Sequence, residues 1–338
     1  MKNHLTYQVS ADAGIITASF KEQAIPELKN SEVLIRSCYS SINYKDALGV
    51  TGRGKIYRSL PMVAGIDVAG IIAKSRHPDF REGDEVLITG CGLGENQDGG
   101  FAEFVRAPGD WAVHLPRGLN LRESMILGTA GFTAALCLHR MEQNGQCPDT
   151  GPVLVTGASG GVGSLAVCIF AARGYRVTAC SRKESARPFL SDIGADEWLH
   201  PDHFRGDPRP LEKGVWGAVV DNVGGPLLSA LLPSVRLWGN VASIGLTSGH
   251  EFKTSVMPFI LRGVSLLGIS SANCPMPLRK IIWKRLAEDL KPTQLSKILQ
   301  KEILFRDIPG AFSPFIEGTV LGRQLVLMEA QIQNKPAS

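Results

Sequence analysis

The sequence predicts an α/β protein with a β-rich N-terminal domain and a second domain built on a doubly wound parallel sheet. Short apolar or alternating runs, separated by Gly, Pro and Asp turns, fill the first third of the chain. From Pro152 onward, apolar strands alternate with helices, which is the pattern of a parallel sheet. The tail returns to strand-like segments. We therefore expect residues 1–124, completed by 299–338, to form one domain and residues 125–298 to form the other.

The elements follow in chain order from these patterns. Strands of the first domain are predicted at 31–43, 64–73, 83–89 and 100–107. The apolar stretch 125–141, rich in small residues, is typical of a well-buried helix. Further strands are predicted at 152–157, 175–180, 216–224, 239–245 and 264–270, with helices reaching Ala172 and covering 186–194. The tail segments 301–318 and 322–328 have a β-like pattern.

Composition places the chain among ordinary globular proteins. Its 338 residues are enough for two domains, and 37 glycines suit many tight strand–helix turns. Hydrophobic residues make up 44% and charged residues 20%. The net charge of +4 is small and dispersed, so it does not indicate a nucleic-acid partner. It fits equally well with one local pocket for an anion.

The N-terminal segment 1–14 has no apolar signal core, and no stretch reaches the ~18 apolar residues of a membrane span. We therefore expect a cytoplasmic protein without a membrane partner. The seven cysteines are widely scattered and none forms a CxxC pair. Reduced, incidental thiols are the expectation, rather than disulfides or a metal site.

A glycine-rich segment from Val153 to Gly163 is the sharpest local motif. An apolar strand ends in Gly157, further glycines follow, and an apolar helix comes next. Glycines in this place permit a tight turn and a close approach of the backbone to a pyrophosphate, which the helix N-terminus then binds. We expect the pyrophosphate of a dinucleotide to be held by Ser159, Gly160, Gly161, Val162 and Gly163.

The second strand of this domain ends in Ser181-Arg182-Lys183. NAD-specific sites usually carry an acidic residue here, which binds the ribose 2′-hydroxyl. A hydroxyl followed by two cations suits a 2′-phosphate instead, because guanidinium donors match phosphate oxygens. The sequence therefore predicts NADPH, rather than NADH, as the cofactor.

Six segments carry a family resemblance: 40–56 (SSINYKDALGVTGRGKI), 61–70 (PMVAGIDVAG), 94–103 (GENQDGGFAE), 128–134 (GTAGFTA), 156–164 (TGASGGVGS) and 256–264 (VMPFILRGV). The chain resembles the medium-chain dehydrogenase/reductase superfamily over nearly its full length, and is similar to its zinc-free quinone oxidoreductase and acryloyl-CoA reductase (NADPH) subfamily. This resemblance implies a GroES-like β-barrel domain beside a Rossmann domain, commonly as a homodimer.

The resemblance also bears on metal. Zinc alcohol dehydrogenases of the superfamily place a Cys ligand where Ile42-Asn43-Tyr44 begins and a His-Glu pair where Ile66-Asp67 stands. Their structural zinc takes four cysteines in the loop that here holds only Cys91. Zinc needs three or four such ligands, so we expect no metal. Hydride addition to a polarised alkene is then favoured over direct reduction of a simple ketone.

Several site residues are implied by position in the family. Tyr44 borders the nicotinamide cleft, where it either positions the ring, relays a proton to the substrate α-carbon, or only packs. Asn43 and Lys45 are expected to orient the loop or contact substrate, and Asp46 and Asp67 to be structural. Cofactor contacts are further expected from Ala47, Leu246, Ile260, Ser270 and Arg323.

The sequence departs from close relatives in one loop. Cys91 stands where they carry Trp, and Gln97-Asp98 where they carry His-Trp or similar. Arg53 and Lys55 lie in a Gly-rich loop, as either an exposed charged loop or a contact for a CoA phosphate. Three functions stay open: reduction of an enoyl thioester such as acryloyl-CoA, reduction of a quinone or enone, and non-catalytic NADPH binding of the crystallin type.

Overall fold

The computed structural model describes residues 3–206 and 208–328, and the chain forms two compact units. The first contains residues 1–129, 272–287 and 299–338; the second contains 130–271 and 288–298. The predicted domain boundaries, 1–124 with 299–338 and 125–298, stay predictions. Along the described residues, no helix is both long and apolar enough to cross a membrane.

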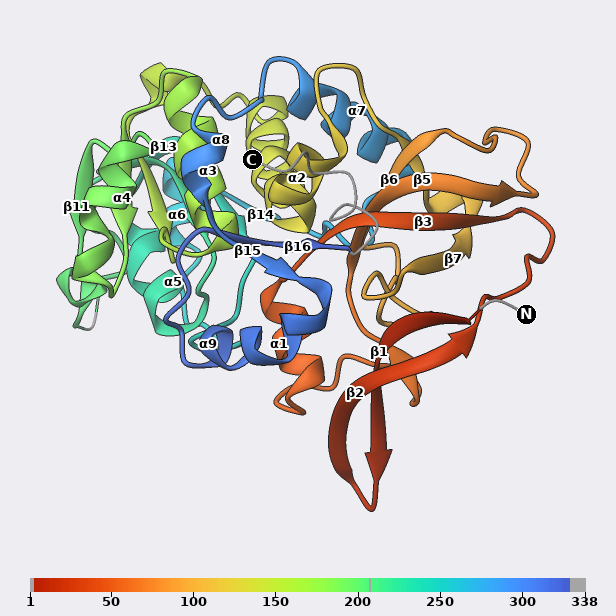
Figure 1. The fold of residues 1–338 in the computed structure, drawn as a ribbon. Coiled ribbons are helices and arrows are strands. Elements are labelled where there is room, and N and C mark those ends of the chain that lie inside the picture. The colour runs from red at the N-terminus through yellow and green to blue at the C-terminus, as the bar shows by residue number, and fades with distance from the viewer. Residues whose placement is uncertain (1–2, 207, 329–338) are drawn as a thin grey trace. The chain divides into compact units, whose positions relative to one another are not determined.

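The first unit contains two mainly antiparallel sheets (Figure 1). Strand order β2-β1-β4 makes the smaller sheet, and β15-β16-β3-β5-β6-β8, with β7 beside β3, makes the larger one. Strand β16 pairs antiparallel with β3, Leu325 opposite Ser41, so the tail joins the N-terminal sheet. The strands are β1 (Asn3–Asp12), β2 (Ile15–Ala24), β3 (Glu32–Ser41), β4 (Met62–Val63), β5 (Asp67–Ser75), β6 (Glu85–Thr89), β7 (Phe104–Pro108), β8 (Val113–His114), β15 (Leu299–Leu304) and β16 (Arg323–Leu327).

The second unit confirms the predicted doubly wound sheet. Its six strands are all parallel, in the order β11-β10-β9-β12-β13-β14. The chain starts at the central strand β9, runs to one edge, and then returns to build the other half from β12. The strands are β9 (Val153–Thr156), β10 (Val177–Cys180), β11 (Glu197–Leu199), β12 (Trp216–Asp221), β13 (Val235–Ser243) and β14 (Ser265–Gly268). The neighbouring carboxyl ends of β9 and β12 form the switch point at which such sheets bind ligands.

Helices connect these strands. The first unit holds α1 (Tyr44–Val50), α7 (Met276–Ala287) and α9 (Ser313–Ile316), and the second holds α3 (Gly161–Ala172), α4 (Arg187–Asp192), α5 (Gly225–Leu231), α6 (Met257–Arg262) and α8 (Leu295–Ile298). The β-like pattern predicted over 301–318 corresponds to a strand only as far as Leu304, because a 3-10 helix, Phe305–Ala311, follows it. Pro309 lies within that helix; it lacks the N–H that a central strand would need.

Helix α2 (Leu121–Gln143) contains the predicted helix 125–141 but is broken at Gly128, whose backbone has φ 51° and ψ −156°. Only glycine adopts that conformation readily, because it has no Cβ. The break lies next to Thr129, the last residue of this stretch of the first unit.

Candidate active site

The glycine-rich loop after β9 has the geometry of a phosphate-binding turn. Gly157 has φ 58°, and α3 begins at Gly161. A Cβ on Gly163 would lie 2.3 Å from the Gly157 carbonyl oxygen, so only glycine lets the helix pack on the turn. Ser159 is buried beside them. The backbone N–H groups of the first turn of α3, from Gly161 onward, suit an anion.

A second loop, after β10, is tied to the first by hydroxyl groups. The Ser181 hydroxyl donates to the Ser159 Oγ at 3.0 Å, and the Lys183 N–H donates to the Ser181 Oγ at 3.1 Å. Arg182 is exposed and Lys183 half-buried. Burial, and then the charge of Arg182, lower the pKa of Lys183. Two neighbouring cations beside a buried serine pair suit a phosphate group, and their assignment to the 2′-phosphate stays a prediction.

Replacing Arg182 with Ala is expected to weaken NADPH binding by about 1.5–3 kcal/mol, the range of a charge-assisted hydrogen bond, and to leave NADH binding nearly unchanged. Titrating the protein with each cofactor, by quenching of its tryptophan fluorescence, measures both affinities. Arg187→Ala, at the exposed start of α4, is the matched control. Equal losses for the two cofactors would remove Arg182 from the 2′-phosphate site.

Asn222, at the end of β12, is a candidate that the sequence analysis missed. Its Nδ2 donates to the Thr156 carbonyl oxygen at 2.8 Å, which fixes the amide. Its Oδ1 is buried and accepts no hydrogen bond from the described residues. A Cβ on Gly157 would lie 3.4 Å from the Asn222 Cβ, and one on Gly245 1.9 Å from the Asn222 carbonyl oxygen. A buried acceptor at the switch point suits a ligand hydroxyl. The signal in the sequence that could have found Asn222 is the segment DNVG, which follows a predicted strand.

Three other predicted cofactor residues belong to the second unit. Leu246 and Ile260 expose 63% and 71% of their surface, and Ser270 is also exposed. Leu246 follows β13, Ile260 lies on α6, and Ser270 follows β14. Exposed apolar side chains are available to a ligand or to another chain, and their assignment stays a prediction.

Tyr44 is the first residue of α1 and has 40% of its surface exposed. Lys45 beside it forms an ion pair with Glu95, Nζ to Oε1 at 3.0 Å. Ala47 is fully buried in the core of the first unit, so its methyl group packs against protein. Asn43, the N-cap of α1, is buried. Of the residues predicted in this segment, Tyr44 and Lys45 present their side chains to solvent.

The first unit holds a buried polar network around Asp67. Its carboxylate accepts hydrogen bonds from the Ser41 hydroxyl at 2.6 Å, the Asn43 Nδ2 at 2.8 Å, and the Thr129 N–H and hydroxyl at 2.9 and 2.6 Å. Arg323, on β16, donates to the Asn43 Oδ1 at 3.1 Å. The guanidinium of Arg323, predicted to contact the cofactor, therefore bonds to protein groups, and its cofactor role stays a prediction.

Asp46 lies beside this network and is fully buried. It accepts the N–H groups of Asn43 and Ile66 at 2.8 and 3.0 Å. Burial and the charge of Asp67 nevertheless raise the pKa of Asp46 to about 7. The Asp46 carboxyl group also interacts electrostatically with the Arg323 guanidinium and with the Tyr57 hydroxyl.

A stability effect of pH follows. Between about pH 4 and about pH 7 the folded protein holds a proton on Asp46 that the unfolded chain has released. The contribution of Asp46 to the free energy of unfolding therefore decreases as pH rises through this range, and it stays constant above about pH 7. The free energy of unfolding of wild type minus that of Asp46→Asn is expected to fall across this range in urea titrations. Asp12→Asn, at an exposed strand end, is the control. Parallel curves for wild type and Asp46→Asn would refute the raised pKa.

The donor set at the positions of the zinc relatives' ligands does not fit zinc. Ile42-Asn43 and Ile66-Asp67 stand there, and the side chains of Asn43 and Asp67 are engaged in hydrogen bonds. Across the described ranges, no group of three His, Cys, Asp or Glu residues lies together to hold a metal. Zinc takes Cys, His or carboxylate ligands in a tetrahedral set.

The loop that departs from relatives is bonded within the first unit. The Gln97 Nε2 donates to the Arg106 carbonyl oxygen at 2.8 Å, and Asp98 accepts the Val63 N–H at 2.9 Å. Cys91 has φ 59°, and burial raises the pKa of its thiol. Gln97 and Asp98 thus support the loop, while Arg53 and Lys55 are exposed.

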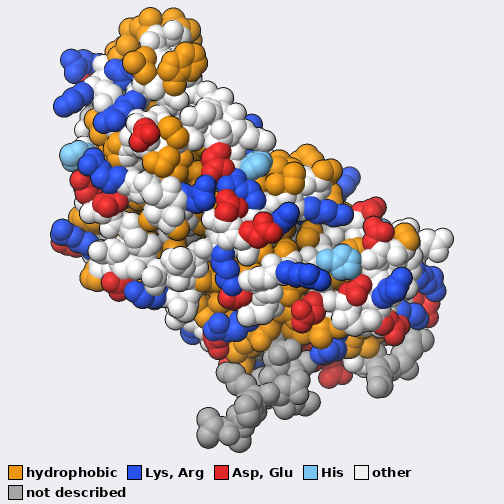
Figure 2. All heavy atoms as spheres, turned by 90° about the horizontal axis from the view of Figure 1, so that it is seen from above, with side chains coloured by type: hydrophobic (Ala, Val, Ile, Leu, Met, Phe, Trp, Pro, Cys, Tyr) orange, Lys and Arg blue, Asp and Glu red, His pale blue; other side chains and the backbone are white. Residues whose placement is uncertain are grey.

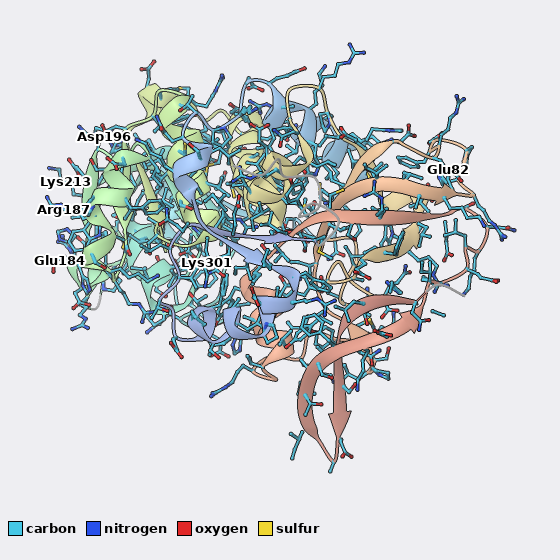
Figure 3. The ribbon with its side chains drawn as sticks, viewed as in Figure 1. Glu82, Glu184, Arg187, Asp196, Lys213 and Lys301 are labelled. Carbon is cyan, nitrogen blue, oxygen red and sulfur yellow. The ribbon has the colours of Figure 1, made fainter. Side chains whose placement is uncertain are left out.

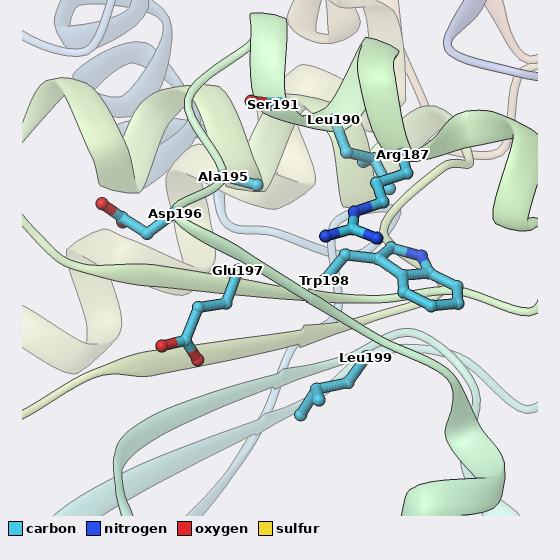
Figure 4. A pocket seen from close by; sticks show the side chains of 8 residues that line it. All are labelled: Arg187, Leu190, Ser191, Ala195, Asp196, Glu197, Trp198 and Leu199. Atoms are coloured by element: carbon cyan, nitrogen blue, oxygen red, sulfur yellow. The ribbon is translucent and has the colours of Figure 1, made fainter.

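A separate cavity of about 320 Å³ lies between α4 and β11 (Figure 4). Figure 4 shows the Arg187 guanidinium close to the indole of Trp198, and Figure 3 labels Arg187 and Asp196 in the same region. The Asp196 carboxylate accepts the Val177 N–H at 2.7 Å. This cavity is lined by edge-strand β11, two strands away from β9, so it is distinct from the switch point.

Figure 2 shows cations and anions interspersed over one face of the molecule, as the small net charge predicts.

The comparisons with known proteins agree with this architecture. Residues 29–117 match the family model described as alcohol dehydrogenase GroES-like domain, and residues 161–288 match that described as zinc-binding dehydrogenase. The chain is 45% identical to the putative quinone oxidoreductase YhfP of Bacillus subtilis, over 94% of this chain and 97% of that one. It is also 45% identical to the probable acrylyl-CoA reductase AcuI of Escherichia coli, over 90% and 93%.

Two crystal structures have the same fold. The yhdH oxidoreductase of Salmonella enterica, in complex with NADP, has a TM-score of 0.93 at 43% identity, covering 96% of this chain and 100% of that one. The structure of B. subtilis yhfP, with NAD bound, has a TM-score of 0.94 at 44% identity, covering 97% and 100%. The chain thus belongs to the medium-chain dehydrogenase/reductase superfamily, in which it is an oxidoreductase related to quinone oxidoreductases and acrylyl-CoA reductases.

Proposed function

We propose that this oxidoreductase reduces the carbon–carbon double bond of an α,β-unsaturated acyl thioester of the acryloyl-CoA type, with NADPH and without a metal. The observation that carries the proposal is a contrast between the two units. The second has a complete dinucleotide loop with two cations, Arg182 and Lys183. In the first unit, Asn43 is hydrogen-bonded to Asp67 and to Arg323. Zinc relatives hold, at these positions, the metal that polarises a substrate carbonyl.

The chemistry follows from what such a site offers. An enoyl thioester has its own electron sink, so it needs positioning and hydrogen bonds rather than a Lewis acid. NADPH supplies a hydride when bound. The Tyr44 hydroxyl, on an exposed side chain, delivers the proton to the α-carbon, with Lys45 held beside it by Glu95.

Support for NADPH comes from the residues themselves and from one relative. Ser181, Arg182 and Lys183 form the expected place for the 2′-phosphate, at the loops held together by Ser159. Ser159, Gly160, Gly161, Val162 and Gly163 bind the pyrophosphate in this proposal, and Leu246, Ile260 and Ser270 lie toward the nicotinamide. The yhdH structure contains NADP, whereas that of yhfP contains NAD. Arg182 is therefore the residue on which the preference depends.

Quinone or enone reduction is the second candidate, favoured by the likeness to YhfP. The test is NADPH oxidation by the purified protein with acryloyl-CoA, crotonyl-CoA, simple enones and quinones, before and after exhaustive chelation. The proposal expects the highest kcat/KM with an enoyl thioester and no loss after chelation. Reduction of quinones alone would replace it with the second candidate, and no turnover with any acceptor would favour a non-catalytic NADPH-binding protein.

We also propose a homodimer formed by the second unit. Trp238 exposes 76% of its surface, and its ring packs over Gly263 at the end of α6. Leu237, Val256 and Leu261 are also exposed, and β14 is an edge strand. Exposed apolar side chains beside an edge strand favour pairing with a second copy. Light scattering of Trp238→Glu tests this: monomers are expected, whereas an unchanged mass, or a monomeric wild type, would refute it.

A further inference from the structure

Arg323 is 2% exposed, and its guanidinium donates hydrogen bonds to four groups on two segments of the first unit, 41–43 and Ile126. The Nε donates to the Ile126 carbonyl oxygen at 2.9 Å, and Nη1 donates to the Ile42 carbonyl oxygen at 3.3 Å and the Asn43 Oδ1 at 3.1 Å. The Nη2 donates to the Ser41 hydroxyl at 2.7 Å. Each nitrogen of the group is therefore engaged by protein, in a fork geometry that only arginine provides.

Asp67 balances this buried charge, with its Oδ2 4.0 Å from the Arg323 Nη2. The Ser41 hydroxyl lies between them, bonded to both. Asp67 also accepts both the N–H and the hydroxyl of Thr129, at the break in α2. Both members of the pair are thus hydrogen-bonded to neighbouring protein groups, and such bonds are needed to offset the desolvation cost of a buried ion pair.

Asn43 connects this pair to α1. Its Nδ2 donates to Asp67 and its Oδ1 accepts from Arg323, so both ends of the amide are held. Its N–H donates to Asp46, which fixes the first turn of the helix. The next residue is Tyr44, whose side chain is exposed, while Asn43 before it makes three hydrogen bonds to protein, one from its backbone N–H and two from its side-chain amide.

We propose that Arg323 and Asp67 are positioning residues, which set the direction of the Tyr44 hydroxyl through Asn43 rather than binding cofactor or substrate. The inference rests on the proposed function, because Tyr44 is the group to be positioned. A proton donor displaced by about 1 Å can cost about 10²-fold in rate, so a rigid N-cap has catalytic value. The effect of Arg323 should then exist only while the Tyr44 hydroxyl is present.

The test is a double-mutant cycle with Arg323→Lys and Tyr44→Phe. Lysine keeps the charge but cannot reach Ile126 and Asn43 at once. Arg323→Lys is expected to lower kcat about 10-fold or more, with KM changed less and the NADPH dissociation constant within about twofold of wild type. In the Tyr44→Phe background it is expected to lower kcat no further. Arg106→Lys, at a half-buried arginine of β7 that is ion-paired with Glu32, is the control.

Hydrogen exchange of residues 41–50 gives a readout that needs no substrate. Arg323→Lys is expected to speed exchange there, with β9–α3 unchanged. Unaltered exchange at 41–50 overturns the inference even if the enoyl reductase activity is real, whereas faster exchange without enoyl reduction overturns only the proposed function. An at least 10-fold weaker NADPH affinity with unchanged kcat, or effects that multiply across the cycle, would also refute positioning.

A second variant covers loss of folding. If Arg323→Lys does not fold, Asp67→Asn combined with Arg323→Gln removes both charges together, which avoids a lone buried ion. The double variant is expected to fold with wild-type NADPH affinity, a reduced kcat and fast exchange at residues 41–50. Wild-type kcat in a folded double variant would contradict the inference.

Discussion

Replacing Tyr44 with Phe is expected to lower turnover of an enoyl thioester by ~10²-fold or more, with little change in NADPH affinity. The substitution removes only the hydroxyl oxygen from an exposed side chain at the start of α1. Proton transfer to the α-carbon would then depend on water. Steady-state kinetics and a cofactor titration on the same preparation separate the two effects.

The control for Tyr44→Phe is Tyr39→Phe, which removes a tyrosine hydroxyl from β3 of the same unit. Its turnover is expected to stay near that of wild type. Unchanged turnover in Tyr44→Phe would make Tyr44 a packing residue and water the proton source. A large loss of NADPH affinity would instead place Tyr44 against the cofactor.

Replacing Gly128 with Ala is expected to have the largest effect on stability. Gly128 has φ 51° and ψ −156°, and an added Cβ would lie 2.6 Å from the Asp67 Oδ2 and the Ser41 Oγ and 2.7 Å from the Arg323 Nη2. Backbone strain of about 1–3 kcal/mol would add to disruption of a buried ionic network, typically about 3–5 kcal/mol. The free energy of unfolding in urea measures the loss, which is expected to exceed about 3 kcal/mol or to abolish folding.

Gly145→Ala separates the two contributions. Gly145 also has a positive φ, 78°, but nothing lies within 4 Å of the added Cβ. Only the backbone cost of about 1 kcal/mol should appear there. Equal losses for Gly128→Ala and Gly145→Ala would show that the polar network tolerates the methyl group.

The features that the sequence predicted well are local. The dinucleotide loop follows from glycines between a strand and a helix, and the parallel sheet from strands alternating with helices. The alternation needs no knowledge of distant contacts. The same local patterns gave 301–318 a β-like character beyond Leu304, because the apolar residues of a 3-10 helix resemble a short strand when they are considered alone.

Local sequence patterns did not predict the buried polar network around Asp67. Ser41 and Arg323 are 282 positions apart in the chain, and their contact arises only when β16 pairs with β3. The sequence analysis gave Arg323 a cofactor role because the tail segment LGRQL was expected to return and close the site near the cofactor. Likewise, the helical pattern of 125–141 concealed the break at Gly128, which precedes the Thr129 N–H that donates to Asp67.

The most direct test of the central claim is the fate of a labelled hydride. NADPH carrying deuterium at the transferred position is incubated with acryloyl-CoA and the protein, and the product is analysed by mass spectrometry and NMR. The account predicts propionyl-CoA with deuterium only at the β-carbon, and a solvent-derived proton at the α-carbon. Label at the α-carbon, or no labelled acyl product while quinones are reduced, would contradict it.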